Sequence, residues 1–105
     1  MVFVLIRRCV KADKEHEFLA SYGKGRPKHG DFIDETLTRM NASADLPESM
    51  RLGAWRRRSS YVTYLNVARW RSAKSFEERF KPRTMHDPKF ECSDRLRGVL
   101  DEVDP

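Results

Sequence analysis

The fold is decided by the stretch Tyr61–Trp70, YVTYLNVARW, which is the clearest strand pattern in the chain. Successive side chains of a strand point to opposite faces, so these residues divide into two alternating sets. β-branched and aromatic residues dominate both sets, which is typical of a strand in the interior of a sheet. The first set is Val62, Tyr64, Asn66, Ala68 and Trp70, and the second is Tyr61, Thr63, Leu65, Val67 and Arg69.

On the N-terminal side, another strand and a helix precede this stretch. Residues 2–10 are rich in β-branched side chains and begin with apolar residues on both faces, which predicts a central strand. Asp13 is positioned to cap the N-terminus of a helix. Glycines and a proline between residues 23 and 27 end that helix. Its predicted apolar stripe consists of Phe18, Leu19 and Tyr22.

Residues 31–41 alternate like a strand as well and predict the second strand of the chain, with a helix as the alternative on propensity alone. Phe32 falls on one of its faces. The opposite face of this strand carries Ile33, Glu35, Leu37 and Arg39.

A polar segment, residues 42–58, follows the strand and is interpreted as a long connection that contains Trp55.

A helix and a last strand are expected after Trp70. Ser72 is positioned as the N-cap of the helix, and Phe76 and Phe80 lie four residues apart on one side of it. Pro82 closes the helix. Residues 97–103 alternate apolar and charged side chains and predict a strand at the edge of the sheet.

The order strand, helix, strand, strand, helix, strand predicts an α+β fold of the ferredoxin-like βαββαβ type. This fold is a four-stranded antiparallel sheet with both helices on one face. The uncovered face would hold Tyr61, Leu65 and Val67, and an apolar face of this kind is expected to meet a second copy. We therefore expect a homodimer through the sheet face. A chain of 105 residues fits one domain, spanning residues 1–105.

The charge of the chain does not indicate a nucleic-acid partner. The net charge is +5, and the densest basic run is Arg56, Arg57 and Arg58. Acidic residues are interleaved with the basic ones almost everywhere, and no recognition motif of the zinc-finger or RNP type occurs. A solvated hairpin that carries arginines is the favoured interpretation, although the charge would also attract small anions.

Other features indicate a cytoplasmic protein without a metal. No stretch approaches the roughly 20 apolar residues of a membrane span, so no membrane partner is expected. The opening apolar run is too short for a signal-peptide core. Two cysteines, Cys9 and Cys92, are expected to be reduced structural thiols, with a bridge or a nucleophile as the less favoured alternatives. The three histidines do not have the spacing of metal ligands.

Residues 64–72, YLNVARWRS, together with Phe76, resemble the third strand and second helix of the antibiotic biosynthesis monooxygenase family. In that family a strand ends in Trp, a small polar cap follows, and the helix carries Phe near its second turn. Residues 30–33, GDFI, are similar to the start of the family's second strand, with Asp31 where a second Gly is usual. The resemblance runs loosely from Phe3 to Phe80 and implies a single domain of this family.

The resemblance implies a dimeric α/β barrel with a cavity between the helices and the sheet. Some members oxidise aromatic phenols or anthrones to quinones with molecular oxygen, using no metal or flavin. Asn66 and Trp70 share one face about 13 Å apart, at roughly 3.3 Å per residue. By the resemblance these two are the catalytic residues, Asn66 bonding a phenol or carbonyl oxygen and Trp70 stacking on an aromatic ring. The expected substrate-binding residues are Tyr64, Tyr22 and Arg7.

Two alternatives stand beside a cofactor-independent monooxygenase that acts on a small aromatic or quinol-type molecule. Trp70, Tyr64 and Tyr22 are equally consistent with core packing, so a non-catalytic dimeric ligand-binding module is the second interpretation. Haem degradation is disfavoured. The haem-degrading relatives carry Asn in the first strand where this chain has Arg7, and His86 lies later than their pattern expects.

Overall fold

The computed structural model describes residues 1–22, 30–41, 45–50, 61–80 and 86–105. Its centre is an antiparallel sheet in the order β2-β3-β1-β4. The strands are β1 Val2–Lys11, β2 Phe32–Arg39, β3 Tyr61–Trp70 and β4 Leu96–Asp101. This order, with β1 and β3 at the centre, confirms the predicted ferredoxin-like α+β fold.

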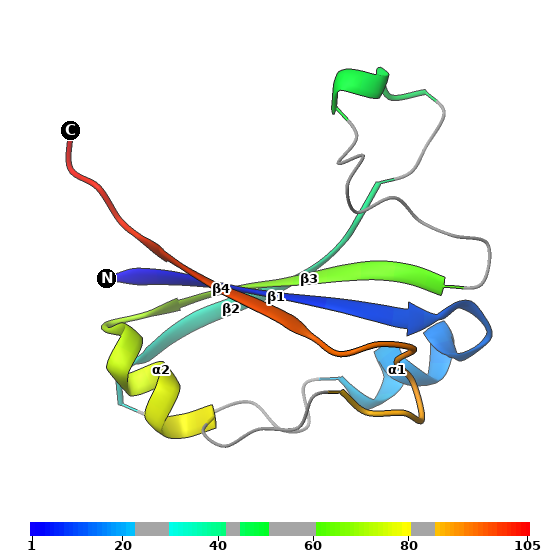
Figure 1. Ribbon diagram of the computed structural model, residues 1–105, viewed down its shortest axis with the longest axis horizontal. Coiled ribbons are helices and arrows are strands. Elements are labelled where there is room, and N and C mark those ends of the chain that lie inside the picture. The colour runs from blue at the N-terminus through cyan, green and yellow to red at the C-terminus, as the bar shows by residue number, and fades with distance from the viewer. Residues whose placement is uncertain (23–29, 42–44, 51–60, 81–85) are drawn as a thin grey trace.

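Two α-helices cover one face of the sheet. A short 3₁₀ turn, η1 Ala12–Lys14, leads directly into α1 Glu15–Ser21, and α2 Ala73–Phe80 follows β3. Figure 1 shows α1 and α2 on the same side of the sheet, near opposite ends of its strands, and η2 Glu48–Met50 on the other side. The sheet therefore has a face covered by α1 and α2, the helix-covered face, and an opposite face that no α-helix of the described residues covers, which we call the open face.

The start of α2 agrees with the sequence prediction, whereas the start of α1 differs from it. The Ser72 hydroxyl accepts a hydrogen bond from the Ser75 amide at 3.2 Å, which confirms Ser72 as the cap of α2. The prediction for Asp13 is wrong. Asp13 lies within η1, and Lys14, which precedes α1, makes no capping bond with its side chain. The intervening 3₁₀ turn displaces the start of the α-helix beyond Asp13.

A bulge in β2 corrects the predicted faces of that strand. Phe32 pairs with Trp70 and Asp34 pairs with Arg69, so Ile33 is an extra residue between two neighbouring pairs. The extra residue turns Phe32 to the helix-covered face, where its ring centroid lies 5.4 Å from that of Trp70. The expectation that Phe32 lies on the face opposite Glu35 is therefore wrong, since Phe32 pairs with Trp70 and Glu35 pairs with Ala68 on the same face.

The core on the helix-covered face consists of two apolar clusters. The first surrounds Trp70 and the second surrounds Tyr64, and β1 and β3 contribute to both. Leu19 is exposed, contrary to its place in the predicted stripe. The first cluster is Val2, Val4, Ile6, Ala68, Trp70 and Phe76, with Phe32 against it, and the second is Val10, Phe18, Val62 and Tyr64, with Ala12, Tyr22, Leu37 and Phe90 against it.

The open face is also rich in apolar side chains. Register partners in a sheet share a face, so the pairs Phe3–Leu100 and Leu5–Val67 lie opposite the helices. Tyr61, Leu65 and Val67 lie on this face, as their alternation predicts, and are half-buried. Leu100 is exposed. This apolar surface carries no α-helix in the described part of the chain.

Several predictions fall outside the described residues: the helix end at residues 23–27, Trp55 with the run Arg56–Arg58, Pro82, and the side chain of Phe80. No helix in the described ranges is long and apolar enough to span a membrane.

Candidate functional site

Asn66 is the centre of the candidate site. Its side chain is fully buried, at 0% exposed, on the helix-covered face between the two apolar clusters. Its amide nitrogen donates to the Tyr22 hydroxyl at 2.5 Å and to Glu35 Oε1 at 2.9 Å. Its amide oxygen accepts from Arg8 Nε at 2.8 Å. An unpaired buried amide would cost about 1–3 kcal/mol, and these three bonds offset that cost.

Arg8 brings a positive charge to this amide. Its guanidinium carbon lies 5.9 Å from the ring centroid of Phe18 and 5.8 Å from that of Tyr22, so it contacts the faces of both rings. Burial lowers the pKa of Arg8, and the charge of Arg95 lowers it further. Glu91, Tyr22 and Glu35 raise it. An arginine remains protonated even so, and the site therefore holds a partly desolvated cation.

A buried ion pair adjoins Arg8. Glu91 is 2% exposed and forms a bidentate pair with Arg95, whose Nε lies 2.9 Å from Oε1 and whose Nη2 lies 2.9 Å from Oε2. The backbone amide of Asp87 also donates to this carboxylate, at 2.8 Å. The residues around Asn66 therefore include two arginines and two glutamates, an arrangement that no sequence motif indicated.

Tyr64 belongs to a separate network at the N-terminal end of α1. Its hydroxyl donates to Glu15 Oε2 at 2.5 Å, and Arg39 Nη1 donates to the same oxygen at 2.9 Å. Burial, followed by the hydrogen bond to Glu15, raises the pKa of Tyr64 to about 12. The phenol is therefore protonated across the physiological range and is engaged with Glu15.

We expect Tyr64→Phe to lower the free energy of unfolding by about 1–3 kcal/mol, because the variant loses a hydrogen bond to a charged acceptor. The pKa of Tyr64 is higher in the folded protein than in the unfolded chain. Its contribution is therefore complete below about pH 10 and is lost between about pH 10 and 12. Urea denaturation at pH 8 and pH 11 should show a smaller gap between variant and wild type at the higher pH. An equal gap at both values would contradict this assignment.

Trp70 packs among apolar side chains. It is 1% exposed, and its ring packs edge to face against Phe32 and Phe76, with the Phe76 centroid 5.7 Å away. It shares the face of Asn66, as the sequence predicts, but it lies inside the first apolar cluster. Of the predicted site residues, Tyr22 accepts a hydrogen bond directly from Asn66.

Arg7 points away from this site. It pairs with Leu65 and Leu96 in the sheet and lies on the open face, whereas its neighbour Arg8 bonds Asn66. The Nε of Arg7 is buried and has no hydrogen-bond partner among the described residues. Alternation along β1 thus exchanges the expected roles of two adjacent arginines.

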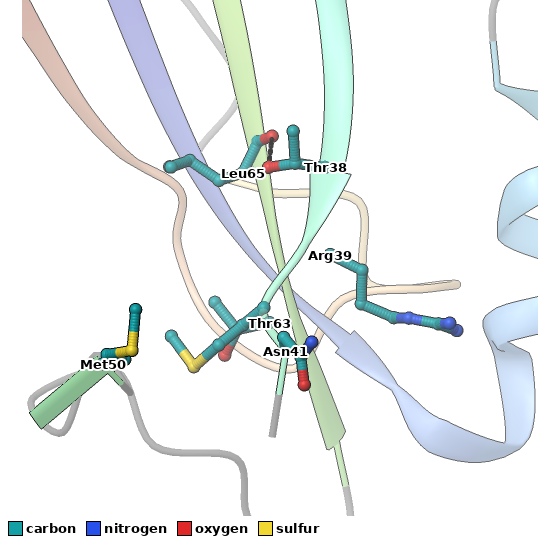
Figure 2. Close-up of a pocket in the computed structure, with 7 residues that line it drawn as sticks. Thr38, Arg39, Asn41, Met50, Thr63 and Leu65 are labelled. Atoms are coloured by element: carbon teal, nitrogen blue, oxygen red, sulfur yellow. Dashed lines mark hydrogen bonds between the residues drawn. The ribbon is translucent and has the colours of Figure 1, made fainter. Parts of the chain in front are cut away.

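A pocket of about 190 Å³ lies elsewhere, on the open side of the sheet. Figure 2 shows Met50 on η2 and Thr63 on β3 among the lining residues, with Thr38 donating to the Leu65 carbonyl at 2.8 Å. This volume is below the roughly 300 Å³ of a small drug-sized site. The pocket contains none of the predicted site residues. Its lining is Thr38, Arg39, Met40, Asn41, Met50, Thr63 and Leu65.

No cluster of three or more His, Cys, Asp or Glu side chains suited to a metal occurs in the described ranges. His86 pairs instead with Asp94, with 2.7 Å between the Nδ1 and Oδ1 atoms.

Comparison with known proteins supports the fold. No family model and no curated protein matches the sequence. The structure is similar to the crystal structure of a putative antibiotic biosynthesis monooxygenase from Bacillus cereus. The TM-score is 0.55 with 14% sequence identity, and the match covers 100% of this chain and 94% of the other. At this identity the likeness establishes a shared fold, so the resemblance seen in residues 64–72 is confirmed at the level of architecture.

Proposed function

We propose that the chain is a member of the antibiotic biosynthesis monooxygenase family and oxidises a small aromatic or quinol-type substrate with molecular oxygen, without a cofactor. The observation that carries the proposal is the polar group around Asn66, buried between two apolar clusters. Asn66 lies in the segment that resembles the family. The shared fold with the Bacillus cereus structure is consistent with this assignment.

The chemistry requires a substrate anion that can give electrons to oxygen. For an anthrone, a base removes a proton and leaves a delocalised carbanion. Oxygen then reacts at that carbon: one oxygen atom becomes the new carbonyl, and the other leaves as water with the two hydrogens of the original methylene. The substrate supplies all the electrons. The protein must position the substrate, accept its proton and stabilise the anion.

The residues around Asn66 suit these three tasks. The Glu35 carboxylate accepts from Asn66 at 2.9 Å and is assigned as the base. The cationic guanidinium of Arg8 is assigned to the developing anion, because charge stabilisation is strongest where water is scarce. Asn66 holds both groups and Tyr22, and is therefore assigned as the residue that orients them. Arg7 has no place in this site.

The two other predicted residues border the site. Tyr64 and Trp70 share the face of Asn66 and lie two and four positions from it along β3, at about 7 and 13 Å by strand geometry. In the proposal they form the apolar limits of the site rather than groups that exchange protons. The protonated phenol of Tyr64 and the edge-to-face packing of Trp70 support this role.

The proposed enzyme is a homodimer through the open face. Phe3, Leu5, Leu65 and Val67 are half-buried there and Leu100 is exposed. Monomers rarely leave a contiguous apolar surface of this kind in water. Two copies related by a two-fold axis would cover it with the same residues from each subunit.

A non-catalytic dimeric ligand-binding module of the same fold is the second candidate, and one observation favours it. The amide of Asn66 already makes three hydrogen bonds within the protein, so its burial needs no substrate. A site that only binds would also need neither a base nor oxygen.

Oxygen uptake distinguishes the two candidates. Purified, metal-stripped protein should consume oxygen with anthrones or hydroquinones above the rate in buffer. Asn66→Ala should reduce that rate about 100-fold, the loss typical when a group that organises an anion site is removed. Glu35→Gln keeps the acceptor for Asn66 and should reduce the rate similarly.

Asn41→Ala is the matched control, since it makes the same change at an exposed position. It should retain the full rate. Each variant is first shown to be folded by circular dichroism. Folded wild type that consumes no oxygen with any substrate of the panel would overturn the oxygenase proposal and favour the binding module.

A further inference from the structure

The two cysteines of the chain, Cys9 and Cys92, lie side by side in the fold although 83 positions separate them. Val10 and Glu91 form an isolated antiparallel bridge, which makes Cys9 and Cys92 the next pair in register. The Cys92 amide donates to the Cys9 carbonyl at 2.9 Å, and the Cys92 thiol donates to the same oxygen at 3.3 Å. Both the amide and the thiol of Cys92 thus bond the backbone of Cys9.

This register suits a disulfide bond. Residues directly opposite each other in antiparallel strands have Cα atoms about 4.5–5.5 Å apart, and their side chains share a face. A disulfide spans Cα separations of about 4.4–6.8 Å. The backbone therefore needs little movement to join the two sulfur atoms.

The two thiols differ in exposure, and this difference determines which thiol reacts first with an oxidant. Cys92 is exposed and Cys9 is buried. A dissolved oxidant meets Cys92 first, and Cys9 is the adjacent thiol that can resolve the adduct. Burial, followed by the neighbouring Cys9, raises the pKa of Cys92. The first step should therefore be slow at neutral pH and faster in alkaline solution, where more thiolate is present.

We propose that Cys9 and Cys92 form a reversible intramolecular disulfide when the protein meets a small-molecule disulfide such as oxidised glutathione. The Cys92 thiolate attacks one glutathione sulfur, which forms a mixed disulfide and releases one glutathione thiolate. The Cys9 thiolate then attacks the Cys92 sulfur and releases the second glutathione. The protein loses two electrons and two protons, and the glutathione disulfide is reduced to two thiols.

The bond would link β1 to the segment that precedes β4. Cys9 is next to Arg8, and Cys92 is next to Glu91, so the link would tie together two residues that carry charges of the candidate site. It would also close a loop of about 80 residues, which constrains the unfolded chain strongly. Protein that carries the internal disulfide, and no disulfide between chains, should therefore unfold at a higher urea midpoint than the reduced protein. This inference does not depend on the proposed oxygenase activity.

The test incubates the full chain with oxidised glutathione, alkylates the remaining thiols and measures the intact mass without reductant. Wild type should lose about 2 Da, the two thiol hydrogens, and take up no alkyl group. Dithiothreitol should restore two alkylatable thiols. Cys9→Ser should stop at one glutathione adduct on Cys92, and Cys92→Ser should remain unmodified while folded.

Three outcomes would overturn the proposal: wild type that stops at a stable glutathione adduct, wild type that forms only a disulfide-linked pair of chains at twice the mass, or wild type that keeps two free thiols at pH 9. The mass distinguishes each of these from the internal bond. An internal bond without a higher urea midpoint would overturn the stabilising role assigned to it.

Discussion

Trp70→Ala should lower the free energy of unfolding by about 3–5 kcal/mol, the usual loss when a large buried aromatic side chain is removed. The indole is 1% exposed and lies between Phe32 and Phe76, with ring centroids 5.4 and 5.7 Å away. Close-packed neighbours fill such a void only in part. A small domain has about 5–15 kcal/mol of stability in total, so the urea midpoint should fall by at least about a fifth, and by most of its value if the domain is marginally stable.

Trp70→Phe is the matched variant that separates packing from catalysis. It keeps an aromatic ring in the cluster and should lose clearly less stability than Trp70→Ala. If Trp70 only borders the site, the folded Phe variant should keep most of the oxygen uptake. A Phe variant that is as stable as wild type but inactive would show that the indole takes part in the reaction. A loss below about 1 kcal/mol for Trp70→Ala would contradict its place in the core.

The strands were predictable because their signal is local. Alternation in Tyr61–Trp70 reflects two different environments on the two faces of β3, and the structure keeps both. The bulge at Ile33 was not predictable. The residues before and after the bulge each keep their own alternation, and the extra residue changes only which face of the sheet the residues before it point to. The start of α1 was missed since Asp13 is a suitable cap by residue type, whereas a 3₁₀ turn occupies that position.

The sequence identified Asn66, the centre of the candidate site, but not the charged side chains that surround it. A polar amide on an otherwise apolar face identifies Asn66 from sequence alone. The sequence could not separate Arg7 from Arg8, because the first strand begins with apolar residues on both faces. The structure separates them: Val2, Val4 and Ile6 are buried on the face that Arg8 shares. Glu91 and Arg95 carried no such signal. Their pairing with each other, and their position beside Arg8, depend on a turn that folds back onto β1.

Val67→Asp should raise the dissociation constant of the proposed homodimer by at least about 100-fold. Val67 is half-buried on the open face, between Leu5 and Thr36 in the sheet, and no charged residue is its direct partner. A carboxylate enclosed there would lose water without gaining a partner. Two-fold symmetry places the substitution in the interface twice, so its effect on association is doubled. Sedimentation velocity over a dilution series measures the change.

Val99→Asp is the control that makes this result specific to one face. It is the same substitution on β4, at a position that is 45% exposed and pairs with the buried Val4 on the helix-covered side. We expect its dissociation constant to stay within about threefold of wild type, because a charge outside a buried interface contributes little. Equal weakening by both variants would indicate damage to the sheet rather than to an interface. Wild type that sediments as a monomer at every concentration would refute the dimer, and the apolar residues of the open face would then need another partner.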